Sequence, residues 1–156
     1  MSLERVRAYF ATQGMAERVR TFAVSSATVE LAARALACEP CRIAKTLSFL
    51  VEGAPVLVVA AGDARIDNPR FKAQFATKPR MLTPDEAERL VGHAVGGVCP
   101  FAVNEGVRVY LDVSLKRFAT VFPACGSANS AIELDLDELE RHSAAVGWVD
   151  VCKNWR

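Results

Sequence analysis

Apolar residues recur at helical spacing in several segments of the chain. Leu3, Val6 and Phe10 fall on one face of a helix that would follow Ser2 and end near Gly14, because glycine is typical of helix ends. Further helices are predicted where a capping side chain precedes helix-forming residues or a proline. They cover residues 28–38, short stretches after 68 and after 83, and residues 135–145.

β-branched and apolar runs predict strands between these helices. Residues 43–51 and 55–61 are predicted as two strands joined by the tight turn Glu52-Gly53. Shorter strands are predicted at residues 19–24, 93–95, 107–113, 119–125, 131–134 and 148–152. Strands that follow one another directly, in irregular alternation with helices, favour the α+β class with a mixed sheet over a doubly wound parallel sheet.

Composition limits the size and class of the protein. With 156 residues, 51% hydrophobic and 24% charged, the chain is long enough to bury a core without disulfides or metals, and it has a globular composition. No repeat or linker divides it. We therefore expect residues 1–156 to form one domain.

The sequence also predicts a compartment. The longest apolar runs, such as residues 54–61, are far shorter than the roughly 20 residues that span a bilayer, and residues 1–10 carry charges. We expect neither a membrane span nor a secretory signal. Five cysteines, an odd number without an export signal, favour the reducing cytoplasm.

Charge is distributed unevenly along the chain. The net charge is only +1, so a global basic field is absent. Residues 133–140 hold five acids and no base. In contrast, residues 65–80 hold one acid, Asp67, and five basic residues: Arg65, Arg70, Lys72, Lys78 and Arg80. The surface is therefore expected to be polarised.

The usual catalytic and metal-binding motifs are weak or missing. Cys38 and Cys41 form a C-x-x-C pair, but a second ligand pair at zinc spacing is missing and the pair follows a predicted helix, unlike a redox motif. The two histidines, His93 and His142, have no nucleophile motif beside them. Cys99 is a candidate thiol because its loop could expose it. We expect no metal and no cofactor.

Three segments could carry chemistry. Lys45 is a charge inside a strand that is otherwise apolar; it either reaches solvent or binds a phosphate or a polarised carbonyl. Residues 96–101 combine paired glycines with a proline, which can bring the backbone close to a ligand or form a plain turn. In residues 126–133, small and hydroxylated residues precede a strand.

Taken in order, these segments resemble the YbaK family and the related prolyl-tRNA synthetase-associated domain. The matching residues are 43–47 (Ile-Ala-Lys-Thr-Leu), 96–101 (Gly-Gly-Val-Cys-Pro-Phe), and Gly126 with the following Ile-Glu-Leu of residues 132–134. The resemblance extends over about residues 19–151. It implies a mixed sheet wrapped into a partial barrel with flanking helices, in agreement with the predicted elements.

The resemblance also implies an activity and a site. Family members hydrolyse the ester of mischarged tRNA, usually proline tRNA carrying Cys, Ala or another small amino acid. Lys45 would contact the terminal nucleotide, and backbone N–H groups of Gly96 and Gly97 would face the ester carbonyl. The expected substrate-binding residues are Phe22, Thr46, Val98, Cys99, Pro100, Phe101, Gly126, Ser127 and Ser130. The basic residues at 65, 70, 72, 78 and 80 would contact the tRNA backbone, or form a solvated helix face.

The partners that follow are aminoacylated tRNA and, as a candidate, the prolyl-tRNA synthetase. Phe22 and Ala131 stand where the cysteine-specific branch of the family carries a tyrosine and an aspartate, which leaves the edited amino acid open. Two rival hypotheses are a non-catalytic tRNA- or nucleotide-binding module of the same fold and a thiol enzyme that uses Cys99 or the Cys38/Cys41 pair.

Overall fold

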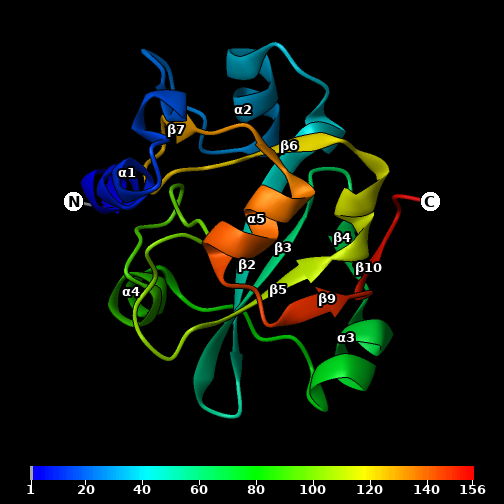
Figure 1. Cartoon of the computed structure of the whole chain (residues 1–156). Helices are drawn as coiled ribbons and strands as arrows, with labels where there is room; N and C mark the ends of the chain where they lie inside the picture. Colours follow the sequence, from blue (N-terminus) through cyan, green and yellow to red (C-terminus); the bar gives the residue numbers. More distant parts are fainter. Residues whose placement is uncertain (1) are drawn as a thin grey trace.

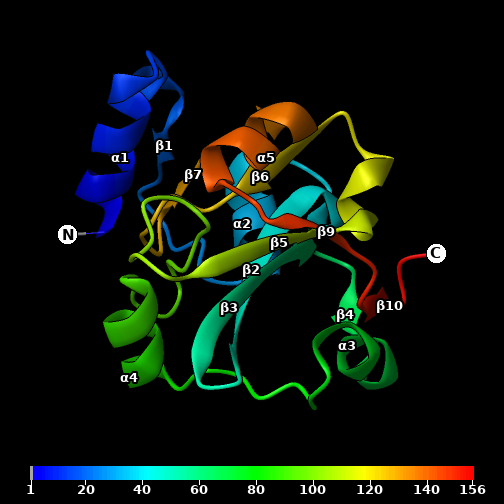
Figure 2. The same cartoon turned by 60° about the horizontal axis from the view of Figure 1, so that its bottom comes forward.

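The computed structural model describes residues 2–156, which form an α+β fold around one curled sheet (Figures 1 and 2). Six strands lie in the order β8-β6-β2-β3-β5-β9. Their bounds are Leu134–Asp135, Thr120–Pro123, Ile43–Val51, Ala54–Ala61, Arg108–Asp112 and Gly147–Val149. The pairs β2-β3 and β6-β8 are antiparallel, whereas β2-β6, β3-β5 and β5-β9 are parallel. The predicted mixed sheet is confirmed.

Two small sheets complete the strand set. β1 (Arg20–Thr21) pairs with β7 (Ser130–Ala131), and β4 (Arg65–Ile66) pairs with β10 (Cys152–Lys153). The helices are α1 (Ser2–Thr12), α2 (Val29–Leu36), α3 (Asn68–Phe75), α4 (Pro84–Glu86) and α5 (Leu136–Ser143). Short turns of helix lie at η1 (Ala16–Arg18), η2 (Pro40–Arg42), η3 (Ala87–Val91) and η4 (Val113–Arg117).

Local capping explains where the helices begin. Thr28 accepts a hydrogen bond from the N–H of Leu31 at the start of α2, and Asp67 does the same for α3. Capping boxes begin α4 at Thr83 and α5 at Asp135, as the sequence predicts. α2 ends at Ala37, whose positive φ of 53° closes the helix in the left-handed conformation.

Two apolar clusters hold the layers together. The larger one joins the sheet to Val6 and Phe10 of α1, Phe71 of α3 and Leu139 of α5. The smaller one lies under α2 and consists of Ala32, Ala33, Ile43 and Phe122. α2 is thereby fixed beside the first residues of β2.

Four strand predictions need correction. Residues 93–95 form a loop, because His93 is buried and uses its ring nitrogen Nε2 to contact the carbonyl oxygen of Phe101 at 2.8 Å. Of the predicted strand at residues 19–24, only Arg20–Thr21 form a strand, β1. The segments 131–134 and 148–152 each contribute to two strands, since β7 and β8 pair with different partners and so do β9 and β10.

Candidate active site

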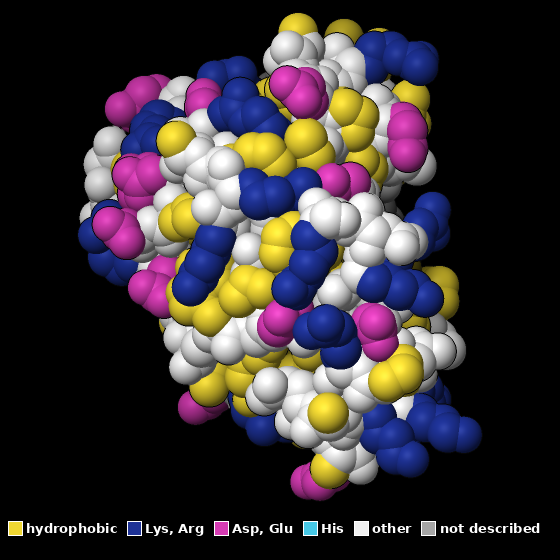
Figure 3. Space-filling model, turned by 90° about the vertical axis from the view of Figure 1, so that its right-hand side faces the viewer, with side chains coloured by type: hydrophobic (Ala, Val, Ile, Leu, Met, Phe, Trp, Pro, Cys, Tyr) yellow, Lys and Arg dark blue, Asp and Glu magenta, His cyan; other side chains and the backbone are white. Residues whose placement is uncertain are grey.

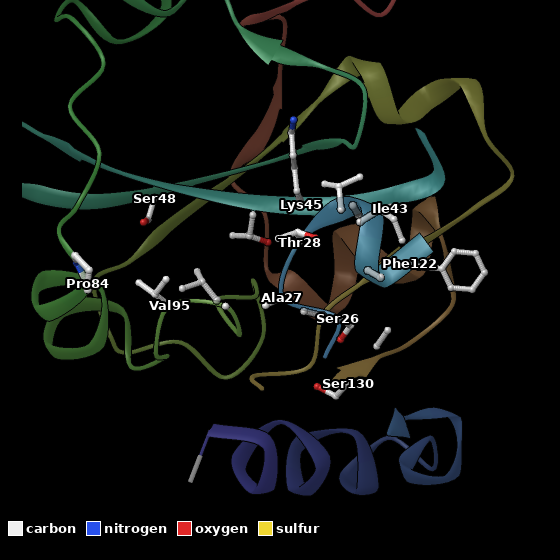
Figure 4. Close-up of a pocket in the computed structure, with 18 of the residues that line it drawn as sticks. Ser26, Ala27, Thr28, Ile43, Lys45, Ser48, Pro84, Val95, Phe122 and Ser130 are labelled. Atoms are coloured by element: carbon white, nitrogen blue, oxygen red, sulfur yellow. The ribbon is translucent and has the colours of Figure 1, made fainter. Parts of the chain in front are cut away.

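A cavity of about 380 Å³ opens between α2, the first half of β2 and the loop that contains Gly96 (Figure 4). Its wall is mostly apolar, with several hydroxyl groups interspersed. The lining residues are Ser26, Ala27, Thr28, Val29, Ala32, Ile43, Ala44, Lys45, Thr46, Ser48, Met81, Leu82, Pro84, Val95, Gly96, Val98, Phe122, Ala124, Ser130 and Ala131.

Lys45 is the charged residue of this lining. It extends from β2 away from Ser26 and Ser130, which lie at the opposite side of the cavity in Figure 4. Its ammonium group donates hydrogen bonds to the carbonyl oxygens of Gly62, at 3.3 Å, and Ala64. Burial lowers the pKa of Lys45, because the charged form loses hydration. Lys45 thus belongs to the lining of this cavity, and its ammonium is bonded to the turn at residues 62–64, which lies outside that lining, without a bonded carboxylate among the described residues.

The loop at residues 96–98 brings backbone to the cavity. Gly96 has a φ of +92°, a conformation that favours glycine, and a Cβ there would lie 3.5 Å from the Cβ of Ala27. The N–H of Gly97 donates to the carbonyl oxygen of Ala94 at 3.0 Å. Within residues 2–156 the N–H groups of Gly96 and Val98 donate to no protein acceptor. Both residues also line the cavity.

Gly97 is placed differently from Gly96 and Val98. It is buried outside the cavity lining, and a Cβ on it would lie only 2.7 Å from the backbone nitrogen of Ser127. Its N–H is already engaged within the turn. Gly97 consequently serves close packing of two loops, and the free N–H groups belong to its neighbours on either side.

Hydroxyl groups supply the remaining polarity of the wall. Ser130 accepts a hydrogen bond from the hydroxyl of Ser127 at 2.7 Å, which ties β7 to the preceding loop. Thr46 has a buried Oγ1 with no hydrogen-bond partner among the described residues. Ser48 lies two residues further along β2 and is 7% exposed. Such a wall can accept a small polar group as well as an apolar one.

Five of the site residues predicted from the sequence line this cavity. Lys45, Thr46, Gly96, Val98 and Ser130 are brought together in the lining. The lining also includes residues that were not predicted: Thr28, Ser48, Met81, Val95 and Phe122. The alternation of Thr46 and Ser48 on one face of an apolar strand was a signal for Ser48. Met81 reaches the site through an isolated bridge to Phe49, which no local pattern indicates.

Other predicted substrate-binding residues lie outside the cavity lining. Cys99, Pro100 and Phe101 are buried, and the ring of Phe101 packs against Phe10 of α1 at 5.0 Å between ring centres. A Cβ on Gly126 would lie 2.8 Å from the backbone of Ser2, so Gly126 packs against α1. The loop turns these side chains toward the core because they are apolar or small.

Phe22 and Ser127 lie outside the cavity lining and contact residues next to it. The N–H of Phe22 donates to the carbonyl oxygen of Asn129 at 2.8 Å, and Asn129 Nδ2 returns a hydrogen bond to the carbonyl of Phe22 at 3.2 Å. Ser127 contacts Ser130, which lines the cavity. These contacts hold the 22–28 segment against the loop that precedes β7.

Cys99 is unsuited to act as a nucleophile. Its thiol is fully buried next to His93, 3.5 Å from Nε2, and burial raises the pKa of the thiol to about 12. We expect Cys99→Ser to keep the ester hydrolysis that the family resemblance implies within about threefold of wild type, since the hydroxyl can keep the contact with the carbonyl of Phe101. Initial rates of amino-acid release from mischarged tRNA check this; loss of activity in a variant that unfolds like wild type would restore the thiol hypothesis.

The five basic residues between Arg65 and Arg80 are all exposed. Arg70 pairs with Asp150 at 3.1 Å and Arg80 with Glu86 at 3.4 Å, whereas Lys72 and Lys78 have no partner among the described residues. Figure 3 shows the side of the molecule on which α3 and the C-terminus lie, and there Lys and Arg side chains are scattered among fewer carboxylates. The Lys and Arg side chains of this side are thus dispersed rather than gathered into a continuous basic strip.

Two absences hold for the part of the chain that the structure describes. Within residues 2–156, no group of three or more His, Cys, Asp or Glu side chains is arranged to hold a metal ion. None of the helices in this part of the chain is both long and apolar enough to cross a membrane.

Comparison with known proteins gives the same fold and a family. The sequence model of the family described as the aminoacyl-tRNA editing domain matches residues 24–142. The solved structure of a proposed trans-editing enzyme for prolyl tRNA synthetase superposes with a TM-score of 0.87 and 29% identity, over 97% of both chains.

Two sequence relatives differ in how much of their length is matched. The uncharacterized protein YwhH of Bacillus subtilis (strain 168) is 54% identical over 156 residues, and the match covers 99% of each chain. The proline–tRNA ligase of Geobacillus thermodenitrificans (strain NG80-2) is 34% identical over 101 residues, which are 64% of this chain and 18% of the ligase. The similarity to the ligase is therefore to a segment of it.

Proposed function

Because the chain belongs to the aminoacyl-tRNA editing domain family, we propose that it is a free-standing deacylase that hydrolyses the ester of mischarged tRNA. The observation that carries the proposal is that one cavity is lined by Lys45 and by Gly96 and Val98, whose N–H groups have no protein acceptor among the described residues. A cation and unpaired backbone donors beside a largely apolar cavity suit an ester whose carbonyl oxygen becomes negative during attack.

The proposed reaction uses water as the nucleophile. Water attacks the ester carbonyl, the C–O bond to the terminal ribose breaks, and the products are the free amino acid and the free ribose hydroxyl of tRNA. The N–H groups of Gly96 and Val98 would stabilise the oxyanion, and a ribose hydroxyl of the substrate would position or deprotonate the water. Such a reaction needs no protein nucleophile, in keeping with the buried thiol of Cys99.

Lys45 would bind the terminal nucleotide of the tRNA. Lys45 belongs to the cavity lining, and in this proposal a phosphate or ribose oxygen of the tRNA end reaches its ammonium there. Contacts to the more distant tRNA backbone would come from the dispersed basic residues, above all Lys72 and Lys78, which lack carboxylate partners among the described residues.

The lining favours a small, uncharged amino acid. Ala131 lies in the wall where the cysteine-specific branch would carry an aspartate, and its methyl group leaves that part of the wall neutral. Phe22, the other departure from that branch, lies outside the lining. We propose proline tRNA carrying alanine, cysteine, serine or threonine as the substrate class, since differences of one methyl or hydroxyl change binding by only about 1 to 3 kcal/mol.

A panel of aminoacyl-tRNAs tests this function. Proline tRNA charged with Ala, Cys, Ser, Thr or Pro is incubated with a catalytic amount of protein, and the remaining ester is followed over time against spontaneous hydrolysis. We expect at least one small mischarged amino acid to be released about 100-fold faster than proline. Binding of the tRNA without accelerated release from any member would favour the non-catalytic binding module.

A further inference from the structure

The ammonium group of Lys45 is directed by the backbone of one turn, residues 62–64. Both of its hydrogen bonds go to carbonyl oxygens of this turn, those of Gly62 and Ala64. No Asp or Glu oxygen lies within 4.0 Å of the ammonium in residues 2–156. The position of the cation therefore depends on the conformation of the turn.

Packing fixes one side of this turn. Gly62 lies so close to η2 that a Cβ on it would be 2.0 Å from the carbonyl oxygen of Pro40 and 2.8 Å from Cγ1 of Val29. At the end of β3, the N–H of Ala61 donates to the hydroxyl of Ser114 at 3.1 Å. Backbone contact and one buried hydrogen bond thus lead the chain into the turn in a defined direction.

An ion pair fixes the other side of the turn at residues 62–64. Asp63 accepts two hydrogen bonds from the guanidinium of Arg117, at 2.6 and 2.9 Å. Arg117 is itself held, because its Nε donates to the carbonyl of Ser114 at 3.0 Å and its Nη1 to the carbonyl of Trp155 at 3.1 Å. The guanidinium also lies over the rings of Phe118 and Trp155. A bidentate pair with this many supports restricts the orientation of the turn.

We propose that Asp63 and Arg117 are positioning residues for Lys45 in the deacylation reaction, an inference that rests on the proposed function. The pair orients the turn, the turn presents its carbonyl groups, and these fix the position of the ammonium. The same contact places Lys45 between the site cavity and a second cavity of about 360 Å³ lined by Glu30, Asp63 and Arg65 among others. Neither Asp63 nor Arg117 lines the site cavity, so their effect passes through Lys45.

Four groups face Lys45 from neighbouring elements: Glu30 of α2, Asp63 of the turn, Arg65 of β4 and Cys152 of β10. Burial lowers the pKa of Lys45 most strongly and Arg65 lowers it further, whereas Cys152, Asp63 and Glu30 oppose the shift. Neutralising Asp63 therefore makes the ammonium lose its proton at a lower pH, whereas removing Arg117 leaves the carboxylate of Asp63 in place.

The test compares Asp63→Asn and Arg117→Gln with wild type. We expect kcat for release of the amino acid to fall about tenfold in both variants, with KM changed less than twofold, because Lys45 remains present and most of the tRNA affinity comes from phosphate contacts elsewhere. NMR titration of the labelled Lys45 side chain should show a lower pKa in Asp63→Asn and no lowering in Arg117→Gln. Arg117→Lys should recover part of the lost kcat, since it keeps the charge but not the bidentate geometry.

Arg18→Gln is the matched control. Arg18 also makes a bidentate pair, with Glu138 at 2.8 and 3.2 Å, and also donates to a backbone carbonyl, that of Glu133, but it lies outside the site lining. Wild-type kcat in both Asp63→Asn and Arg117→Gln, or an equal loss in Arg18→Gln, would overturn the inference. A wild-type protein that releases no amino acid would refute the proposed function instead, and an unchanged pKa of Lys45 in Asp63→Asn would still refute the link between the pair and the lysine.

Discussion

Lys45→Ala is expected to lower kcat/KM for deacylation at least about 100-fold, equivalent to roughly 2.7 kcal/mol of transition-state stabilisation. The reason is that Lys45 provides the charge of the site lining, and the carbonyl groups of Gly62 and Ala64 fix the position of its ammonium. The free energy of unfolding should change by less than about 1 kcal/mol, because truncation removes a desolvated charge together with its hydrogen bonds.

Two further lysine variants make the result specific. Lys45→Met keeps the stem that lines the cavity and removes only the charge, so it should lose nearly as much activity as Lys45→Ala. Lys153→Ala removes an exposed lysine of β10 and should leave kcat/KM unchanged. Single-turnover release of the amino acid and denaturant unfolding measure both properties; an active Lys45→Met would show that the stem, not the ammonium, matters.

Gly96→Val is expected to reduce hydrolysis at least about 100-fold while the Kd for tRNA changes less than about threefold. At a φ of +92° a β-branched residue is strained by roughly 1 to 3 kcal/mol, so the loop shifts and its free N–H groups move from the cavity. The phosphate contacts that provide tRNA affinity are spread over other side chains.

Gly106→Val is the control that distinguishes backbone strain at a positive φ from a position in the cavity lining. Gly106 has a nearly equal φ of +89°, with nothing within 4 Å of the position that a Cβ would take, and it lies outside the cavity lining. We expect a similar loss of stability and full hydrolysis. If both valine variants lost hydrolysis equally, or if Gly96→Val remained active, the backbone of the 96–98 loop would have no special part in the chemistry.

Most of the helices and strands could be predicted from short-range features of the sequence. Capping boxes at Thr83 and Asp135 mark two helix starts in the chain and in the structure alike. The hairpin around Glu52-Gly53 was predicted from its turn residues and its two apolar runs. In the structure, residues 44–51 of β2 pair with residues 54–61 of β3. These features depend on neighbours in sequence, so they can be inferred without the fold.

The predictions that needed correction depend on distant contacts. Residues 93–95 look like a strand, but His93 is drawn into the core by the carbonyl of Phe101. The direction in which a loop turns its side chains is likewise a tertiary property, and for this reason Cys99 and Phe101 lie in the core while Gly96 and Val98 line the cavity. Met81 belongs to the site only because residue 81 pairs with Phe49 of β2.

The proposed deacylase activity is tested most directly by the rate at which the wild-type protein releases the amino acid from mischarged proline tRNA. The protein is used in excess over each charged tRNA, and the first-order rate constant is compared with spontaneous hydrolysis and with the Lys45→Ala variant. We expect release at least about 100-fold above the spontaneous rate for one or more small amino acids, and near-spontaneous release with Lys45→Ala. Spontaneous rates for every mischarged tRNA, or equal rates for the wild type and the variant, would contradict the proposed activity and its site.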